Sequence, residues 1–483
     1  MLRCMNRITA LAAVWFVWLT STAFAQGTLP ATSQPAGLSD EQLTAAIKSE
    51  LGPRFQATDA AQYVAAHDLI ERFFAATTKQ DRSDLTKRLE ETHLDANVLG
   101  RLCHVRRGWA ELTPGTYFIN DTFGAFEVKY FLGIPQNYSR LTPTPLVITL
   151  PTADPFLTNP PPDNAGVTKI YVDWMKEEVA RHRDAVVLMP MLNLDQLYGP
   201  SRIGMNTVMQ AMHHAADKVN TDPQRVYLIG HSMGGHAAWN LALHYPTYFA
   251  AFAPLAGTAA ADWQRLRLMG LRNVLPVVWQ DSDDQVIPPQ ANRAVVRVLR
   301  DMKFDVQYIE TKNVGHVPPP QIIAQVCDAM RARTRELYPH EVLIQTNKPE
   351  TAFNRADWAQ IYQPLRPGQE QRLRITHGTG PMVVNQNTCS LQAVYNGNKV
   401  TAKTDNVLLM RFYFNDQMID FKQAVTISVN GKTRFEGFIT PSVDEMLKDQ
   451  LFLGRGWRYF TGIVDLDLTQ SPGTTKPTTQ PTK

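Results

Sequence analysis

Cysteine is scarce in this sequence, with four residues among 483, at positions 4, 103, 327 and 389. Their wide spacing excludes the closely set pairs that hold a structural zinc ion. Three of the four lie beyond residue 25, an odd number that leaves at least one thiol outside any disulfide. We expect Cys103, Cys327 and Cys389 to be buried free thiols, and we expect neither a metal nor an organic cofactor.

Excess charge is also lacking. The 48 Lys and Arg residues nearly balance the 45 Asp and Glu residues, for a formal net charge of +3 at pH 7. Without Arg3 and Arg7 the balance is 46 to 45, a net charge of +1. Proteins that bind nucleic acids carry a basic surface that neutralises phosphates, so we expect no nucleic-acid partner.

The N-terminal apolar run is short for a membrane span. It extends from Ile8 to Leu19, about twelve residues, whereas a spanning helix needs roughly twenty. Arg3 and Arg7 precede it, and Ala23-Phe24-Ala25 follows, which is the order of a secretory signal peptide. The sequence therefore predicts a leader at 1–25 and an exported, periplasmic or extracellular protein without stable membrane insertion. A membrane anchor is the alternative.

Composition separates two polar segments and one helical segment from the rest of the chain. Residues 26–39 are rich in Thr, Pro, Ser and Gly and predict a flexible linker, and the Thr/Pro/Gln-rich residues 469–483 predict a disordered tail. Residues 40–110 carry apolar side chains at helical spacing, which predicts a helical region. Asp59, Ser83 and Asp84 are the candidate helix caps.

Residues 111–340 alternate between short apolar runs of β-forming residues and amphipathic segments. This alternation predicts a mostly parallel sheet covered by helices on both faces, an α/β fold. The strands are predicted at 116–119, 126–134, 146–150, 185–189, 226–229, 250–255, 274–279 and 304–309. The helices are predicted at 205–219, 236–244, 289–302 and 321–337.

Residues 341–468 read as a small all-β domain, resembling a sandwich. Two Asn-Gly pairs, Asn396-Gly397 and Asn430-Gly431, each lie between β-forming runs. Both residue types tolerate the positive φ of a type I′ hairpin turn, so each pair predicts a hairpin.

The sequence Gly230-His231-Ser232-Met233-Gly234-Gly235 directly follows a predicted strand and opens a predicted helix. A serine on such a sharp turn needs residues without side chains nearby, and Gly230 and Gly234 provide them. The turn would project the Ser232 hydroxyl above the sheet and place the Met233 N–H where an oxyanion forms. A glycine-rich turn that only packs a helix on a strand is the alternative.

A serine hydroxyl becomes nucleophilic when an imidazole takes its proton, and an acid must orient that imidazole. An acidic loop follows the strand predicted at 274–279, and His316 lies in the loop after the strand predicted at 304–309. Asp281, Asp283 and Asp284 are the candidates for the acid. His231 is adjacent to Ser232, and we expect its ring to point away from the hydroxyl.

The order Ser232, Asp, His316 resembles the α/β-hydrolase superfamily, nearest its esterase and prolyl-oligopeptidase-like (S9-like peptidase) branches, over about residues 116–337. The run from Tyr130 to Tyr138, leading to 146–148, is similar to the entry strands of esterases in that group. In this family the acid stands four residues before a proline, which implies Asp284, with Pro288 following. Asp281 and Asp283 then read as turn residues.

The resemblance implies a second oxyanion donor after the strand predicted at 146–150. The sequence there is Pro151-Thr152-Ala153-Asp154, where family members usually have His-Gly. Pro151 has no N–H, so Thr152 or Ala153 is the candidate donor.

These observations predict a serine hydrolase that cleaves carboxylic esters, carried on small molecules or on polymers, through an acyl-enzyme. The resemblance favours esters because Met233 follows the serine, where oligopeptidases more often have tyrosine. A prolyl-oligopeptidase-like serine peptidase and a non-catalytic binding protein on a hydrolase scaffold are the alternatives. The β domain either contacts polysaccharide or shields the mouth of the active site.

Overall fold

The computed structural model describes residues 37–123, 126–150, 175, 177–178, 181–191, 202–259, 261–347, 354–366, 371–377, 380–386 and 388–470. The predicted leader at 1–25, most of the predicted linker and nearly all of the predicted tail therefore lie outside the described residues. Within those ranges, no helix combines the length and the apolar character needed to cross a membrane.

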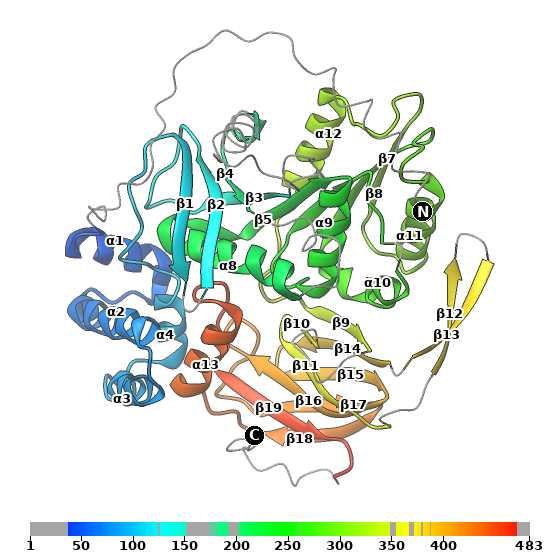
Figure 1. Cartoon of the computed structure of the whole chain (residues 1–483). Coiled ribbons are helices and arrows are strands. Elements are labelled where there is room, and N and C mark those ends of the chain that lie inside the picture. Colours follow the sequence, from blue (N-terminus) through cyan, green and yellow to red (C-terminus); the bar gives the residue numbers. More distant parts are fainter. Residues whose placement is uncertain are drawn as a thin grey trace.

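The N-terminal region is helical, as expected (Figure 1). It contains α1 (Asp40–Leu51), η2 (Gly52–Arg54), η3 (Ala57–Asp59), α2 (Ala60–Ala75), α3 (Lys79–Glu90) and α4 (Ala96–Leu102). The cap predictions fail in part. Asp59 precedes α2 but makes no side-chain cap bond, and Ser83 and Asp84 lie inside α3. The cap of α3 is Thr78, whose hydroxyl accepts the Asp81 N–H and starts the helix a turn earlier.

An eight-stranded sheet forms the central layer, in the order β1-β2-β4-β3-β5-β6-β7-β8 (Figure 1). Its strands are β1 (Gly115–Phe123), β2 (Phe126–Ile134), β3 (Thr144–Leu150), β4 (Val186–Pro190), β5 (Thr221–His231), β6 (Ala251–Leu255), β7 (Leu275–Asp281) and β8 (Gln307–Thr311). Strands β1 and β2 run antiparallel to their neighbours, and β4, β3, β5, β6, β7 and β8 are parallel. The sheet is mostly parallel, as expected.

Helices cover both faces of this sheet. The described helices are α8 (Arg202–Lys218), α9 (Met233–His244), α10 (Asp262–Leu266), η4 (Leu268–Asn273), α11 (Pro289–Asp301) and α12 (Pro320–Arg331). Apolar side chains of α8, α9 and α11 share one core with residues such as Ile148 and Leu228, whereas α12 packs on the other face against Tyr227 and Val277. The prediction of an α/β fold is confirmed.

Several predicted elements differ from the structure: β5 begins at Thr221 rather than at 226, and β1 extends to Phe123 rather than to 119. Strand β8 begins at Gln307 rather than at 304, because Phe304 is buried in the core at the end of α11. Helix α12 ends at Arg331 rather than at 337. Beyond that helix, Arg335 turns inward and donates hydrogen bonds to the carbonyls of Phe249 and Asn273.

The C-terminal region contains two sheets around one core, as expected for a small sandwich. One sheet has the order β18-β17-β15-β14-β9 and the other β10-β11-β16-β19, while β12 and β13 form a separate hairpin (Figure 1). The core includes Ile344 and Leu391 from the first sheet and Ile361 and Phe412 from the second. The strands are β9 (Glu341–Thr346), β10 (Arg355–Ala356), β11 (Ala359–Pro364), β12 (Gln371–His377), β13 (Gly380–Gln386), β14 (Cys389–Asn396), β15 (Lys399–Asp405), β16 (Val407–Phe414), β17 (Val425–Val429), β18 (Lys432–Gly437) and β19 (Gly462–Asp467).

Both Asn-Gly pairs lie at hairpins, but only one forms the predicted turn. Asn430 and Gly431 both have positive φ, 52° and 77°, between β17 and β18. In the other hairpin, Asn396 pairs with Lys399 as the last residue of β14, so the turn is Gly397-Asn398, with positive φ at Gly397. The strand register extends one residue further than the sequence motif suggested.

A helix near the C-terminus completes the core of the N-terminal region. Helix α13 (Val443–Leu453) lies against the N-terminal helices (Figure 1). Its side chains Met446 and Leu447 are fully buried with Leu43 and Leu99. The two ends of the described chain therefore share one apolar cluster.

The cysteine prediction is confirmed. Cys103, Cys327 and Cys389 are all buried, and none of the three forms a disulfide bond. Burial raises the pKa of the Cys103 thiol to about 11 and that of the Cys327 thiol to about 12, so both stay protonated and packed as small apolar groups.

A buried cluster of charges connects the C-terminal region to the base of the central sheet. Asp357 lies between Arg335 and Arg458, and all three side chains are at most 3% exposed. The Asp357 N–H donates to the Thr247 hydroxyl at 3.0 Å, and Arg458 donates to the Thr247 carbonyl. One carboxylate thus pairs with two guanidinium groups from different parts of the chain.

We predict that Asp357→Ala destabilises the whole protein by about 3–5 kcal/mol, because two buried cations lose their shared partner. The free energy of unfolding in urea measures this loss. The matched control is Asp305→Ala, which removes an exposed acid 3.6 Å from Arg333 and should change stability by less than about 1 kcal/mol. Equal effects of the two substitutions would contradict the assigned role of Asp357.

Candidate active site

The turn between β5 and α9 has an unusual backbone conformation at Ser232. Its φ is +56° and its ψ is −112°, a combination that costs a residue with a Cβ atom about 1–3 kcal/mol. Two backbone hydrogen bonds hold it: the Ser232 N–H donates to the Leu255 carbonyl at 2.8 Å, and the Ser232 carbonyl accepts the His236 N–H at 3.0 Å. The chain therefore reverses sharply at the serine.

Glycines make this turn possible. A Cβ atom added to Gly230 would lie 2.3 Å from the carbonyl oxygen of Gly234. A second pair, which the sequence analysis did not single out, brings α9 close to β6: a Cβ atom on Gly257 would lie 2.4 Å from the carbonyl carbon of Gly235. Such contacts cannot be relieved by a side-chain rotation, since the opposing atoms are backbone.

His316 lies within hydrogen-bond distance of Ser232. It belongs to the loop between β8 and α12, and its Nε2 is 2.9 Å from the Ser232 Oγ. Its Nδ1 is 2.9 Å from Asp284 Oδ2. The structure thus joins Ser232 and His316 with Asp284, the acid that the family resemblance implied, in one line of hydrogen bonds.

The Asp284 carboxylate is fully buried and accepts four hydrogen bonds. Oδ1 accepts the N–H groups of Val286 and Ile287, at 2.8 and 3.0 Å. Oδ2 accepts from His316 and, at 2.9 Å, from the Gln280 side-chain amide. Burial alone would raise the pKa of Asp284, but the hydrogen bonds from His316 and the two backbone N–H groups hold it below its usual value. An ionised carboxylate only accepts, so Nδ1 of His316 carries the proton.

Gln280 is a residue that the sequence analysis missed. It is fully buried at the end of β7, its amide nitrogen binds Asp284, and its oxygen accepts the Asn292 side-chain N–H at 2.8 Å. Nothing in the motif marks a glutamine at this place, because its partner Asn292 lies on the next helix.

The two alternative acids bind the backbone of the histidine loop instead of the imidazole. Asp281 Oδ2 accepts the Thr311 hydroxyl at 2.8 Å and the Val314 N–H at 3.2 Å. Asp283 Oδ2 accepts the Asn313 N–H at 2.9 Å. Burial would raise the pKa of Asp281, but its hydrogen bonds lower it overall. Asp281 and Asp283 therefore position the loop that carries the imidazole.

Of the predicted oxyanion donors, Met233 lies within the described residues. Met233 is the first residue of α9, where an N–H has no partner within the helix and the helix dipole is positive. The backbone at this position can therefore stabilise a negative charge. Thr152 and Ala153, the candidates for the second donor, lie outside the described residues.

His231 contacts His316, which the sequence analysis did not anticipate. Its Nε2 is 2.8 Å from the main-chain carbonyl oxygen of His316, and the two ring centroids are 4.9 Å apart. The pKa of His231 is lowered to about 4, chiefly by burial. The partner is 85 residues away in sequence, so no local signal could have found it.

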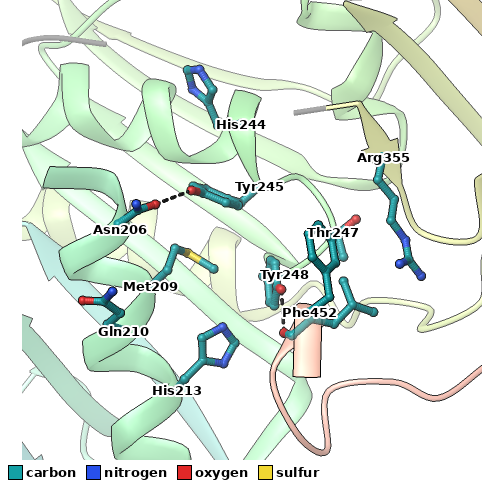
Figure 2. Close-up of a pocket in the computed structure, with 11 residues that line it drawn as sticks. Asn206, Met209, Gln210, His213, His244, Tyr245, Thr247, Tyr248, Arg355 and Phe452 are labelled. Atoms are coloured by element: carbon teal, nitrogen blue, oxygen red, sulfur yellow. Dashed lines mark hydrogen bonds between the residues drawn. The ribbon is translucent and has the colours of Figure 1, made fainter. Parts of the chain in front are cut away.

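A separate cavity of about 300 Å³ lies at the opposite end of α9 from Ser232. Figure 2 shows Met209 and His213 of α8 on one side, with Tyr245 and Tyr248 next to them. Tyr248 donates to the Leu453 carbonyl at 2.6 Å, so the cavity lies where the end of α13 meets α8 and the segment after α9. It contains none of the residues joined to Ser232.

Comparison with protein families gives one match. The family model described as "Putative esterase" matches residues 212–305, a span that includes Ser232 and Asp284.

Two curated relatives are similar over part of the chain. They are the S-formylglutathione hydrolases of Mus musculus and Rattus norvegicus, each 28% identical over 106 residues. The match covers 21% of this chain and 36% of each relative, so the chain spans about a third of the length of the relatives it matches.

Two solved structures illustrate the structural matches. A thermostable esterase is 21% identical, with a TM-score of 0.36, over 46% of this chain and 63% of its own. Esterase 2 of Thermogutta terrifontis, phosphoramylated by tabun, is 10% identical, with a TM-score of 0.34. The match covers 45% of this chain and 94% of that esterase chain.

We predict that Gly230→Ala destabilises the protein by at least about 2 kcal/mol, because the new methyl group would overlap the Gly234 backbone. Urea unfolding measures the change. Gly108→Ala is the matched control, since the nearest atom to its added Cβ is 3.8 Å away, and it should change stability by less than about 1 kcal/mol. If Gly230→Ala unfolded at the wild-type urea concentration, the close approach would not constrain the turn.

Proposed function

We propose that this chain, an α/β-hydrolase, is an exported serine hydrolase that cleaves carboxylic esters through an acyl-enzyme. The observation that carries the proposal is the line of hydrogen bonds from Ser232 Oγ through His316 to Asp284, each 2.9 Å long. Nucleophile, base and orienting acid need this geometry. The family match to esterases supports the choice of reaction.

In the first half of the proposed reaction, Ser232 forms the acyl-enzyme. His316 Nε2 takes the hydroxyl proton as Ser232 Oγ attacks the ester carbonyl carbon. The carbonyl oxygen becomes an oxyanion, which the Met233 N–H stabilises together with a donor from Thr152 or Ala153. The intermediate then collapses: the bond to the alcohol oxygen breaks, and His316 gives its proton to the departing alcohol.

In the second half, water replaces the alcohol. His316 removes a proton from the water molecule as the water oxygen attacks the acyl carbon. The second intermediate then releases the carboxylic acid, and His316 returns the proton to Ser232 Oγ. Asp284 stays ionised throughout, because its hydrogen bonds keep its pKa low, and it stabilises the protonated His316.

The location and partners of the enzyme are part of the proposal. Export rests on the predicted leader at 1–25, and the natural substrate is a small-molecule or polymer-borne ester. The C-terminal β region is the candidate for polysaccharide contact. The alternatives are a prolyl-oligopeptidase-like peptidase and a non-catalytic binding protein.

We predict that a fluorophosphonate probe labels Ser232, because the adjacent imidazole activates its hydroxyl. Ser232→Ala should abolish labelling and lower kcat for aryl esters by about 10⁴-fold or more, and Asp284→Asn should lower kcat by up to about 10⁴-fold. Labelled-peptide mass spectrometry and steady-state kinetics measure these effects. The matched control is Ser139→Ala, a half-buried serine whose hydroxyl accepts a backbone N–H and which should keep full activity. Folded wild-type protein that fails to react would favour a non-catalytic scaffold.

We further predict that the enzyme prefers esters to amides. Aryl esters of increasing acyl length and Xaa-Pro aryl amides, tested side by side, give the two values of kcat/KM. We expect ester turnover to exceed amide turnover by at least about 10²-fold, a difference of roughly 2.7 kcal/mol in the barrier. Amide turnover at a comparable rate would favour the peptidase.

A further inference from the structure

We propose that His231 is a positioning residue: its ring N–H binds the main-chain carbonyl of His316 and fixes the imidazole of His316 between Ser232 and Asp284. This inference rests on the proposed function, because it assigns the device that holds the general base in place. A carbonyl oxygen only accepts hydrogen bonds, so the contact of 2.8 Å requires the proton on Nε2 of His231.

The surroundings of His231 keep this proton in place. Burial is the main cause that lowers the pKa of His231 to about 4, with a smaller contribution from the His316 side chain; Asp284 acts in the opposite direction. The ring is therefore neutral at ordinary pH, and its one N–H is the one bound to the carbonyl. The neutral ring of His231 can then pack with its centroid 4.9 Å from that of the His316 ring without placing two like charges side by side.

The histidine loop needs a support on the side of Ser232. Asn313 and Gly315 have positive φ, 59° and 82°, so the loop turns sharply just before His316. The bonds from Asp281 and Asp283 hold the backbone at Val314 and Asn313, on the side of β7. Within the described residues, the His231 bond is the one that joins the β5 end of the site to the backbone of His316 itself.

The position of His231 in the chain makes this support direct. It is the last residue of β5 and directly precedes Ser232, so the residue that supports the base is next to the nucleophile at the end of one strand. Catalytic groups must lie within about 0.5 Å of their productive positions, and a shift of about 1 Å can cost roughly 10²-fold in rate. Loss of the hydrogen bond from His231 would allow the imidazole of His316 to move from its position, although every group that reacts would still be present.

The test compares His231→Leu with His231→Gln. The glutamine amide nitrogen can occupy nearly the place of the imidazole Nε2 and still donate, whereas leucine fills similar volume without a donor. We expect His231→Leu to lower kcat by about 10- to 100-fold with KM changed less than about threefold, and His231→Gln to recover most of the loss. His244→Leu is the control for burial, because His244 also bonds a backbone carbonyl, that of Asn240, at the far end of α9. It should lose stability but keep kcat.

A second readout does not require turnover. Hydrogen exchange of the backbone N–H groups of Val314, Gly315, His316 and Val317 should accelerate in His231→Leu and remain slow in His231→Gln. Wild-type kcat and slow exchange in His231→Leu, or equal losses of kcat in the leucine and glutamine variants, would overturn the positioning role. If wild-type protein hydrolyses no ester but the exchange pattern holds, the proposed function fails and the support of the loop by His231 stands.

Discussion

The site depends on one strained residue. Ser232 adopts a positive φ that its side chain disfavours, and the conformation persists because the Leu255 carbonyl and the backbone of α9 bind it on both sides. The close approach of Gly230 to Gly234, and of Gly235 to Gly257, leaves no room for the chain to relax. As a result, the hydroxyl points away from the sheet and the first N–H of α9 lies beside it, so nucleophile and oxyanion donor come from one turn.

The remaining groups reach Ser232 because neighbouring parallel strands end at the same edge of the sheet. Strand β7 leads into the loop with Asp284, and β8 leads into the loop with His316. Asp281 crosses between these loops, since its carboxylate binds both Thr311 and Val314. The imidazole is thus oriented by hydrogen bonds at both ends of its ring and supported along its backbone, before any substrate arrives.

Sequence could predict the parts of the site that local chemistry or chain order specifies. The glycines around Ser232 mark the turn, and chain order predicts that an acid from the loop after β7 and His316 meet it. The resemblance to α/β-hydrolases implied that this acid is Asp284, which lies 2.9 Å from His316. The sequence could not indicate the roles of Gln280 and His231, because their hydrogen-bond partners lie on other elements. In the fold, periodicity predicted the parallel sheet and its helices, but the docking of α13 on the N-terminal helices leaves no local pattern. The ends of helices and strands were predicted least well, because Thr78 caps α3 and Phe304 packs in the core, and neither role follows from apolar periodicity.

The shared apolar cluster of α13 and the N-terminal helices limits when the N-terminal region can complete its folding. The first helices are synthesised long before their packing partners Met446, Leu447 and Tyr459, roughly 350 residues later along the chain. During translation the apolar faces of these helices lack their packing partner α13. This apolar cluster can form only when α13 has been synthesised. The N-terminal helices from Asp40 onward therefore reach their final packing only after α13 has been synthesised.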